Sequence, residues 1–313
     1  MNIKKILFSS ILFLSISSHT TTLPHNKQSY PYITGSTLAS FCDYIIPPNN
    51  KIRFDPAKIK DGSKIFATST DSSIKFFFTK VHPKINAKYV LITHDALYKA
   101  DLNVYKKYLD EDKVIAWFGK NLFVDHPKAY TLPLGIVNQS YQPGNTKIFD
   151  KLRSNLPKKD ILLYMNFRQG TGPGPQRAIR QFVWDFFSDK KYCTKTAYST
   201  GKNAKSFNGY INDVARSKFT LSPRGGGVDC YRTWEAMLVG SIPIVETSPL
   251  DPILEGLPII IIDDWTKITE EFLIQKYEEI TSKTYNLEKL FIPYWLDKIN
   301  QVIHSNANTN SNT

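Results

Sequence analysis

The stretch KFTLSPRGGGVDCYRTWEAMLVGSIPIV, residues 218–245, decides the fold of this chain. It predicts a short apolar strand over Lys218–Ser222, a glycine-rich loop, a helix from Asp229 to about Val239 and then a second strand. Asp229 is expected to cap the start of the helix, and Gly240 suits the position just beyond its end. Strand, loop and helix in this order form part of an α/β domain.

The glycine-rich loop and the helix after it carry the residue types of an anion-binding site. Main-chain amides of a glycine loop and of a helix N-terminus favour negative charge, and Arg224 and Arg232 add guanidinium groups. Glu235 follows Arg232 by three residues, so the two share a helix face. Arginines for phosphates and a carboxylate for sugar hydroxyls are the groups that hold a diphosphate with an attached ribose.

These residues resemble the exostosin-like glycosyltransferases, whose nucleotide-sugar domain carries a similar S-P-R-G-x-G-x-D-C-x-R-x-W-E-A block followed by G-x-I-P-I-V. The similarity continues through Ser248–Leu250 and Leu257–Trp265, and extends more weakly from about Tyr89 to Trp295. It implies a GT-B-like fold, in which two Rossmann-type doubly wound α/β domains face a cleft. Gly226 departs from the polar residue often found between the glycines, and this leaves the phosphate interpretation intact.

A second group of donor-binding candidates follows the predicted strand over 161–166, where open α/β sheets bind ligands. Arg168 could reach the diphosphate from there, and the resemblance gives it a similar place; a surface arginine on a loop is the alternative. The loop over 170–174 is neither a dinucleotide fingerprint nor a P-loop, because its glycine spacing differs and no Lys-Ser/Thr pair follows. The donor-binding candidates are Asn166, Arg168, Ser222, Arg224, Gly225, Gly226, Gly227, Asp229, Arg232 and Glu235.

The catalytic candidates are His94 and Asp95, which follow the predicted buried strand over 89–93. Glycosyl transfer with inversion needs a base that takes the proton from the attacking hydroxyl, and an imidazole or carboxylate at a strand end can serve. The alternative is structural: Asp95 caps a following turn, and His94 is a buried polar residue with a partner.

The sequence predicts no metal site and no cofactor besides the nucleotide-sugar donor. Asp110–Asp112 reads D-x-D, a pattern by which GT-A glycosyltransferases hold a divalent metal, but here it closes a lysine-rich helix. A solvated helix end with charge pairing explains these carboxylates. The resemblance implies that arginines and a helix dipole stabilise the leaving diphosphate instead.

Length and charge restrict the class of protein. The 313 residues suffice for two domains, and 42% hydrophobic with 13% aromatic residues favours packed cores. The net charge of +12 suits anionic partners, but the lysines are scattered and no nucleic-acid motif is present, so nucleic acid is not expected as a partner. Residues 1–17 read as a signal peptide, which predicts export or a secretory-pathway lumen; an uncleaved anchor that associates with a membrane is the alternative.

Composition shifts divide the chain into segments. A polar segment over 153–160 suggests a domain boundary, an apolar run over 74–81 suggests a strand, and Leu287–His304 has the helical periodicity of a terminal helix that could cross back to the first domain. The predicted segments are 1–17 signal peptide, 18–29 flexible leader, 30–155 acceptor-side α/β domain, 156–304 nucleotide-sugar-binding α/β domain and 305–313 disordered tail.

Together these features predict a glycosyltransferase that moves a sugar from a nucleotide-sugar donor to a hydroxyl of a glycan or glycoconjugate. Three alternatives stay open. The chain could be a non-catalytic, degenerate glycosyltransferase fold that binds glycans, or a hydrolase of nucleotide sugars or phosphate esters. A nucleic-acid binder is disfavoured by the scattered charge.

Overall fold

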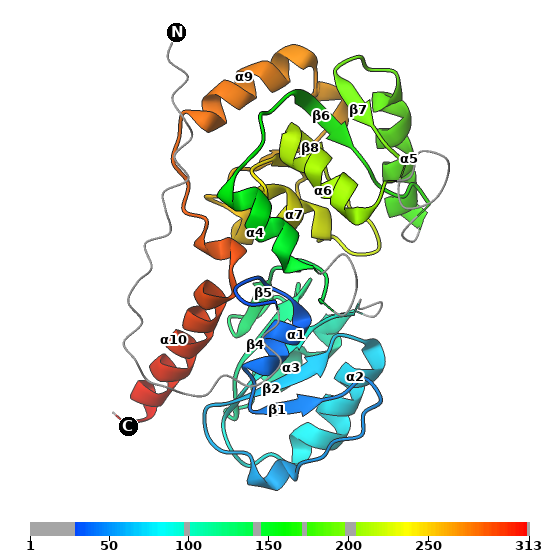
Figure 1. The fold of residues 1–313 in the computed structure, drawn as a ribbon. Helices are drawn as coiled ribbons and strands as arrows, with labels where there is room; N and C mark the ends of the chain where they lie inside the picture. Colours follow the sequence, from blue (N-terminus) through cyan, green and yellow to red (C-terminus); the bar gives the residue numbers. More distant parts are fainter. Residues whose placement is uncertain (1–28, 97–100, 140–144, 171–173, 198–204, 312–313) are drawn as a thin grey trace.

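The computed structural model describes residues 29–96, 101–139, 145–170, 174–197 and 205–311. They form two α/β domains, one above the other in Figure 1, each built on a five-stranded parallel sheet. This confirms the prediction of two parallel α/β domains. The predicted signal peptide and residues 18–28 of the leader lie outside the described residues. None of the helices in the described ranges is both long enough and apolar enough to cross a membrane.

The first sheet has the strand order β1-β2-β3-β4-β5. Its strands are β1 (Tyr44–Ile46), β2 (Ser63–Thr68), β3 (Tyr89–His94), β4 (Val114–Lys120) and β5 (Ala129–Leu132). Because each connection steps to the next strand in the same direction, right-handed crossovers put the connecting segments on one face. On that face α2 (Asp71–Phe76), the π turn Phe77–Val81 and α3 (Lys106–Leu109) pack against β2, β3 and β4.

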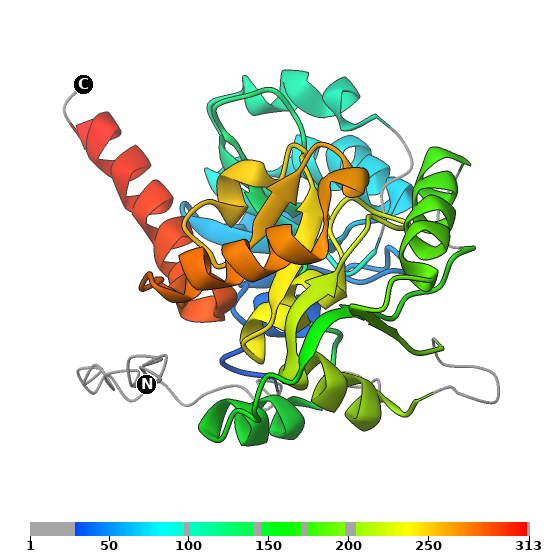
Figure 2. The same ribbon diagram turned by 90° about the horizontal axis from the view of Figure 1, so that it is seen from above.

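The other face of the first sheet is covered by both ends of the described chain. The short helix α1 (Gly35–Ser40) contributes Leu38, and the last helix α10 (Ile292–Ser311) crosses back from the second domain along this face. Figure 2 shows α10 leaving the second domain to one side. Ile292, Trp295 and Ile299 are at most 2% exposed and pack in one cluster with residues of β2, β3 and β4. The first domain therefore takes part of its core from the end of the chain.

The second sheet has the order β7-β6-β8-β9-β10, so the direction of winding reverses between β6 and β8. Its strands are β6 (Ile161–Met165), β7 (Cys193–Lys195), β8 (Ser217–Leu221), β9 (Ile242–Glu246) and β10 (Ile260–Ile262). The helices of this domain are α4 (Thr146–Ser154), α5 (Gly174–Ser188), α6 (Phe207–Arg216), α7 (Tyr231–Leu238), α8 (Asp251–Leu254) and α9 (Glu270–Thr281). Ligands of doubly wound sheets bind outside the carboxyl ends of the strands at such a reversal, here β6 and β8.

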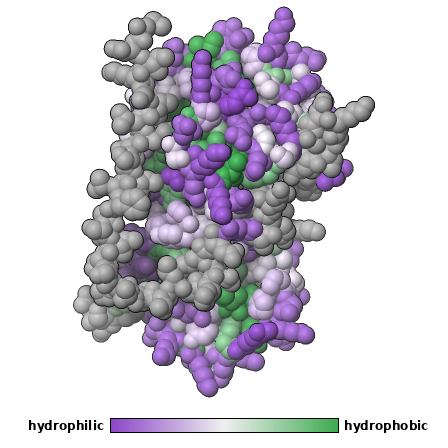
Figure 3. Space-filling view, viewed as in Figure 1, coloured by the Kyte–Doolittle hydropathy of each residue, from purple (hydrophilic) through white to green (hydrophobic). Residues whose placement is uncertain are grey.

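A shared apolar cluster joins the two domains. Tyr32, Leu134 and Ile136 of the first domain pack with residues of α4, α6 and α7 of the second. By contrast, the outer surface visible in Figure 3 is mainly hydrophilic, with only small separate hydrophobic areas among the coloured residues. The junction therefore buries apolar surface, which favours a fixed arrangement of the domains.

Most predicted strands and helices are present, and two predictions are wrong. The run over 74–81 is helical: Thr70 caps α2 by accepting a hydrogen bond from the Ser73 amide, and Ile74, Phe77, Phe78 and Val81 are buried at helical spacing. The predicted disordered tail is also helical up to Ser311, because α10 continues through it.

The boundary between the domains also has structure. Helix α4, which lies inside the predicted first domain, packs against α6 of the second, with Phe149 and Leu152 in the shared cluster.

Candidate functional site

The glycine-rich loop begins where β8 ends and leads into α7, at the reversal of the second sheet. The Ser222 hydroxyl lies 2.9 Å from the Thr233 hydroxyl, which ties the start of the loop to the first turn of α7. The Gly225 amide donates to the Gly227 carbonyl at 3.0 Å, and Gly226 between them is exposed. The loop is thus a tight turn whose middle faces solvent.

The sequence predicted that Asp229 caps α7, and this prediction is wrong. Cys230 occupies the N-cap position, and its side chain makes no capping hydrogen bond. The Asp229 carboxylate accepts hydrogen bonds from the Leu134 amide of the first domain at 2.7 Å and from Trp234 Nε1 at 2.8 Å. Its own amide donates to Asn121 Oδ1 of the first domain at 3.1 Å. Burial raises the pKa of this carboxyl to about 6. Asp229 therefore anchors the loop to the first domain.

Arg232 lies inside the site with part of its guanidinium unpaired. It is 8% exposed, its Nε donates to the Asn166 carbonyl at 2.9 Å, and its guanidinium carbon lies 5.3 Å from the centre of the Phe167 ring. Among the residues that the structure describes, its buried Nη1 has no hydrogen-bond partner. An unpaired buried donor on a cation costs free energy that an anionic ligand would recover.

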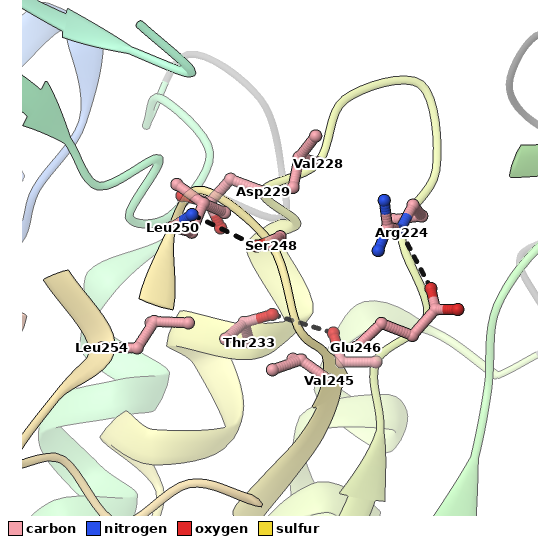
Figure 4. A pocket seen from close by; sticks show the side chains of 10 residues that line it. Arg224, Val228, Asp229, Thr233, Val245, Glu246, Ser248, Leu250 and Leu254 are labelled. Carbon is pink, nitrogen blue, oxygen red and sulfur yellow. Dashed lines mark hydrogen bonds and ion pairs between the residues drawn. The ribbon is translucent and has the colours of Figure 1, made fainter. Parts of the chain in front are cut away.

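Arg224 and Glu246 form an ion pair at the edge of a small pocket. Arg224 Nε lies 2.9 Å from Glu246 Oε2, and its Nη2 donates to the Thr247 carbonyl at 3.0 Å. Figure 4 shows the two side chains facing each other on one side of the pocket, with Leu254 on the opposite side. The pocket is lined by Ser222, Arg224, Val228, Asp229, Thr233, Val245, Glu246, Ser248, Leu250 and Leu254. Sequence reasoning missed Glu246, although its place at the end of a predicted strand was a usable signal.

Glu235 is buried on α7 rather than open to the pocket. It is 5% exposed and accepts a hydrogen bond from the Tyr210 hydroxyl at 2.8 Å. Burial raises the pKa of this carboxyl to about 7, although the Tyr210 hydrogen bond and the Arg232 charge act in the opposite direction. The predicted face shared with Arg232 exists, but both side chains are buried.

The raised pKa of Glu235 predicts a pH-dependent stability. The folded state binds more protons than the unfolded chain between the ordinary pKa of 4.5 and about 7, so stability falls as pH rises through this range. As the pH rises from 4.5 to 7.5, we expect the free energy of unfolding of Glu235→Gln to increase by about 3 kcal/mol relative to that of the wild type, at about 1.4 kcal/mol per pKa unit. Urea unfolding of both proteins across this range measures the difference. A difference that stays constant with pH would contradict the assignment.

Asn166 and Arg168 follow β6 next to the glycine-rich loop, as predicted. The Asn166 side chain donates to Thr196 Oγ1 at 2.7 Å. Its main-chain carbonyl accepts the hydrogen bond from Arg232 Nε. The Arg168 side chain is exposed, and its carbonyl accepts a hydrogen bond from Arg180 Nη1 at 3.0 Å. Sequence reasoning missed Arg180, a buried residue of α5 that also reaches the glycine-rich loop.

His94 and Asp95 lie at the carboxyl end of β3, as predicted, but in different environments. His94 is 1% exposed, and its Nε2 lies 3.1 Å from the Pro133 carbonyl. The Asp95 side chain is 28% exposed and accepts a hydrogen bond from Asn138 Nδ2 at 3.0 Å. Burial alone would raise the pKa of Asp95, but His94, Asn138 and Lys120 together lower it, so this carboxylate is ionised at neutral pH. Of the two candidates, Asp95 is the one with a partly exposed side chain.

Lys120, a buried lysine of the first sheet, interacts electrostatically with Asp95 and Asp229. It ends β4, is 2% exposed and donates to the Ala96 carbonyl. Burial lowers its pKa to about 8, opposed by the negative charges of Asp229 and Asp95. Its ammonium group therefore attracts a carboxylate of each domain. Nothing in the sequence alone distinguished this lysine from the others.

The acidic D-x-D string lies elsewhere, and two of its three carboxylates have side-chain partners. Asp110 lies 3.1 Å from His126 Nε2, and Glu111 lies 3.1 Å from His82 Nε2 and 3.7 Å from Lys113. Across the described ranges, no three or more His, Cys, Asp and Glu side chains gather in a way that could hold a metal.

The second domain also matches a known domain family. Residues 177–308 match the RXYLT1 C-terminal domain. The chain is 23% identical over 198 residues to ribitol-5-phosphate xylosyltransferase 1 from Danio rerio, a match that covers 57% of this chain and 43% of that protein. The chain thus spans less than half the length of this relative. The matched domain includes α7, with Arg232 and the glycine-rich loop.

Solved glycosyltransferase structures are more distant. An α1,3-fucosyltransferase aligns with a TM-score of 0.41 and 10% identity, over 80% of this chain and 93% of that chain. A sucrose-phosphate synthase from Thermosynechococcus elongatus aligns with a TM-score of 0.39 and 11% identity, over 77% and 74%. The neighbours in sequence and in structure are glycosyltransferases, and membership of the exostosin-like subgroup stays a prediction.

Proposed function

We propose that this protein is a glycosyltransferase of the GT-B type that transfers a sugar from a nucleoside diphosphate donor to a hydroxyl of a glycan or glycoconjugate. The observation that carries the proposal is Arg232: a buried guanidinium with an unpaired nitrogen, next to a glycine-rich loop at the reversal of a parallel sheet. The match of residues 177–308 to a domain of a xylosyltransferase family supports it. The exostosin-like subgroup is part of the proposal.

The donor diphosphate is proposed to lie between the loops that follow β6 and β8. Arg168, Arg224 and Arg232 would neutralise its charge, and amides of the Gly225–Gly227 loop would donate hydrogen bonds to it, that of Gly225 only after giving up its bond to the Gly227 carbonyl. The leaving diphosphate would then need no divalent metal. Ser222 and Asn166 hold the two loops, since their side chains bond to Thr233 and Thr196.

Two carboxylates compete for the donor ribose. Glu235 would have to exchange its Tyr210 partner for a ribose hydroxyl. Glu246 already lines the pocket, where its second oxygen can accept hydrogen bonds while Arg224 holds the first. Export or a secretory-pathway lumen, predicted from residues 1–17, belongs to the same proposal.

The experiment that tests the proposal is a thermal-shift panel of UDP-, GDP-, CMP- and ADP-linked sugars on the purified protein. A donor that binds only the folded state raises the free energy of unfolding by about 2.7 kcal/mol at about 100 times its Kd. We expect a shift with one nucleotide class, followed by transfer to a glycan acceptor. Binding without transfer would favour a non-catalytic glycan-binding protein, release of free sugar to water would favour a hydrolase, and no shift with any donor would contradict the proposal.

Asp95 is the proposed catalytic base because it is ionised and partly exposed at the carboxyl end of β3. We expect Asp95→Asn to lower kcat about 100-fold or more, the usual contribution of a general base, while donor affinity stays within twofold. The matched control is Asp125→Asn, which changes a fully exposed carboxylate of the same domain. Wild-type turnover of Asp95→Asn would exclude Asp95 as the base and leave the donor site standing.

A further inference from the structure

Arg180 joins the two loops that border the proposed donor site. It belongs to α5, is 7% exposed, and sits with its guanidinium between the loop after β6 and the loop after β8. Its Nη1 donates to the Arg168 carbonyl at 3.0 Å, its Nε to the Arg224 carbonyl at 2.9 Å and its Nη2 to the Pro223 carbonyl at 3.4 Å. One side chain therefore fixes main-chain atoms on both sides of the sheet reversal.

The glycine-rich loop is shaped to receive this guanidinium. A Cβ atom added at Gly225 would lie 2.3 Å from Arg180 Nη2 and 2.7 Å from its Cζ, distances far inside van der Waals contact. Gly225 is buried, and its φ lies outside the left-handed region that favours glycine. Glycine is therefore required here because the Arg180 guanidinium occupies the place of a side chain. The glycine at 225 and the arginine at 180 form one packing unit.

Phe167 couples the same unit to Arg232. The guanidinium carbon of Arg180 lies 5.7 Å from the centre of the Phe167 ring, and that of Arg232 lies 5.3 Å from it. Each distance is within the range of a cation–π contact. Displacement of Arg180 would therefore disturb the glycine-rich loop, the loop after β6 and the aromatic ring against which Arg232 packs.

We propose that Arg180 is a positioning residue, which holds the loops after β6 and β8 at the spacing that accepts a diphosphate without touching the diphosphate itself. The inference rests on the proposed donor site. It also gives Gly225 a steric role, which is to leave room for the Arg180 guanidinium, in addition to its place in the anion-binding motif. Its hydrogen bonds to three carbonyl groups distinguish it from Arg168, Arg224 and Arg232, whose proposed role is contact with the ligand.

The test is a double-mutant cycle of Arg180→Ala and Gly225→Ala, with Arg177→Ala as the control on an exposed arginine of the same helix. The probes are UDP, GDP and inorganic pyrophosphate, titrated calorimetrically. We expect each single variant to weaken binding of the best probe tenfold or more. Because both changes remove the same contact, the double variant should be no more than about twofold weaker than Arg180→Ala. Independent losses that multiply to 100-fold or more would overturn the proposal.

Hydrogen exchange provides a second readout that needs no ligand. We expect amides over 222–227 to exchange faster in Arg180→Ala, and millimolar guanidinium to restore both slow exchange and probe affinity in that variant but not in Gly225→Ala. Should Arg180→Ala fail to fold, Arg180→Lys, which keeps the charge and loses the fork of donors, replaces it in the cycle. Unchanged exchange over 222–227 would overturn the proposal. If the wild type binds no probe, the donor site fails, and the exchange data still decide the role of Arg180.

Discussion

Replacing Arg232 with alanine will lower the affinity for the nucleotide-sugar donor about 100-fold. A hydrogen bond to a charged group contributes about 1.5–3 kcal/mol, and each 1.4 kcal/mol is a factor of ten in Kd. Arg232 offers such a bond from a buried site, because it is 8% exposed and its Nη1 has no hydrogen-bond partner in the described part of the chain. Calorimetric titration of the donor found in the panel measures the loss.

A second substitution separates binding from folding. Arg232→Met keeps most of the buried volume and removes the charge, so we expect it to lose donor affinity while the thermal midpoint of the unliganded protein stays the same or rises. Arg216→Ala is the control, because Arg216 is exposed on α6 and pairs with Asp160 at the surface. A fall of several degrees in Arg232→Met, with donor affinity retained, would make Arg232 a structural residue instead.

Replacing Asp229 with alanine will destabilise the protein by about 2–6 kcal/mol. The change leaves two buried donors, the Leu134 amide and Trp234 Nε1, without their acceptor, and each unsatisfied donor costs about 1–3 kcal/mol. It also removes a side chain that connects the glycine-rich loop to Leu134, just after β5. Urea unfolding at pH 7 measures the loss.

The matched variant is Asp229→Asn, which keeps one oxygen acceptor and removes a charge that is costly in this place, as the raised pKa of Asp229 indicates. We expect it to lose clearly less stability than the alanine variant. Hydrogen exchange should show faster exchange of the Leu134 amide in Asp229→Ala, because this amide loses its acceptor. Equal stability of wild type and Asp229→Ala would refute this role.

The parts of the structure that could be predicted are those fixed by residues close together in the sequence. The stretch 218–245 contains its own strand, turn and helix signals, and β8, α7 and β9 follow them. Gly240 has a φ of +72° just after α7, as expected for a residue beyond a helix end. Strands β3 and β4 are continuous apolar runs buried on both faces, the usual pattern of parallel sheets.

The parts that could not be predicted depend on partners far away in the chain. Asp229 has the residue type of a helix cap, but one of its oxygens accepts a hydrogen bond from the Leu134 amide, 95 positions earlier. Arg180 reaches Arg224 across 44 positions, and its own segment contains no motif. The run over 74–81 is different, since its buried residues at 74, 77, 78 and 81 already had helical spacing, which the richness in phenylalanine obscured.

The position of α10 has a consequence for how the protein is made. The N-terminus of a chain leaves the ribosome first, and N-terminal domains usually fold before C-terminal ones. Here the first sheet waits for Ile292, Trp295 and Ile299 before its second face is closed. We expect the nascent first domain to keep part of one apolar face exposed until α10 has been synthesised.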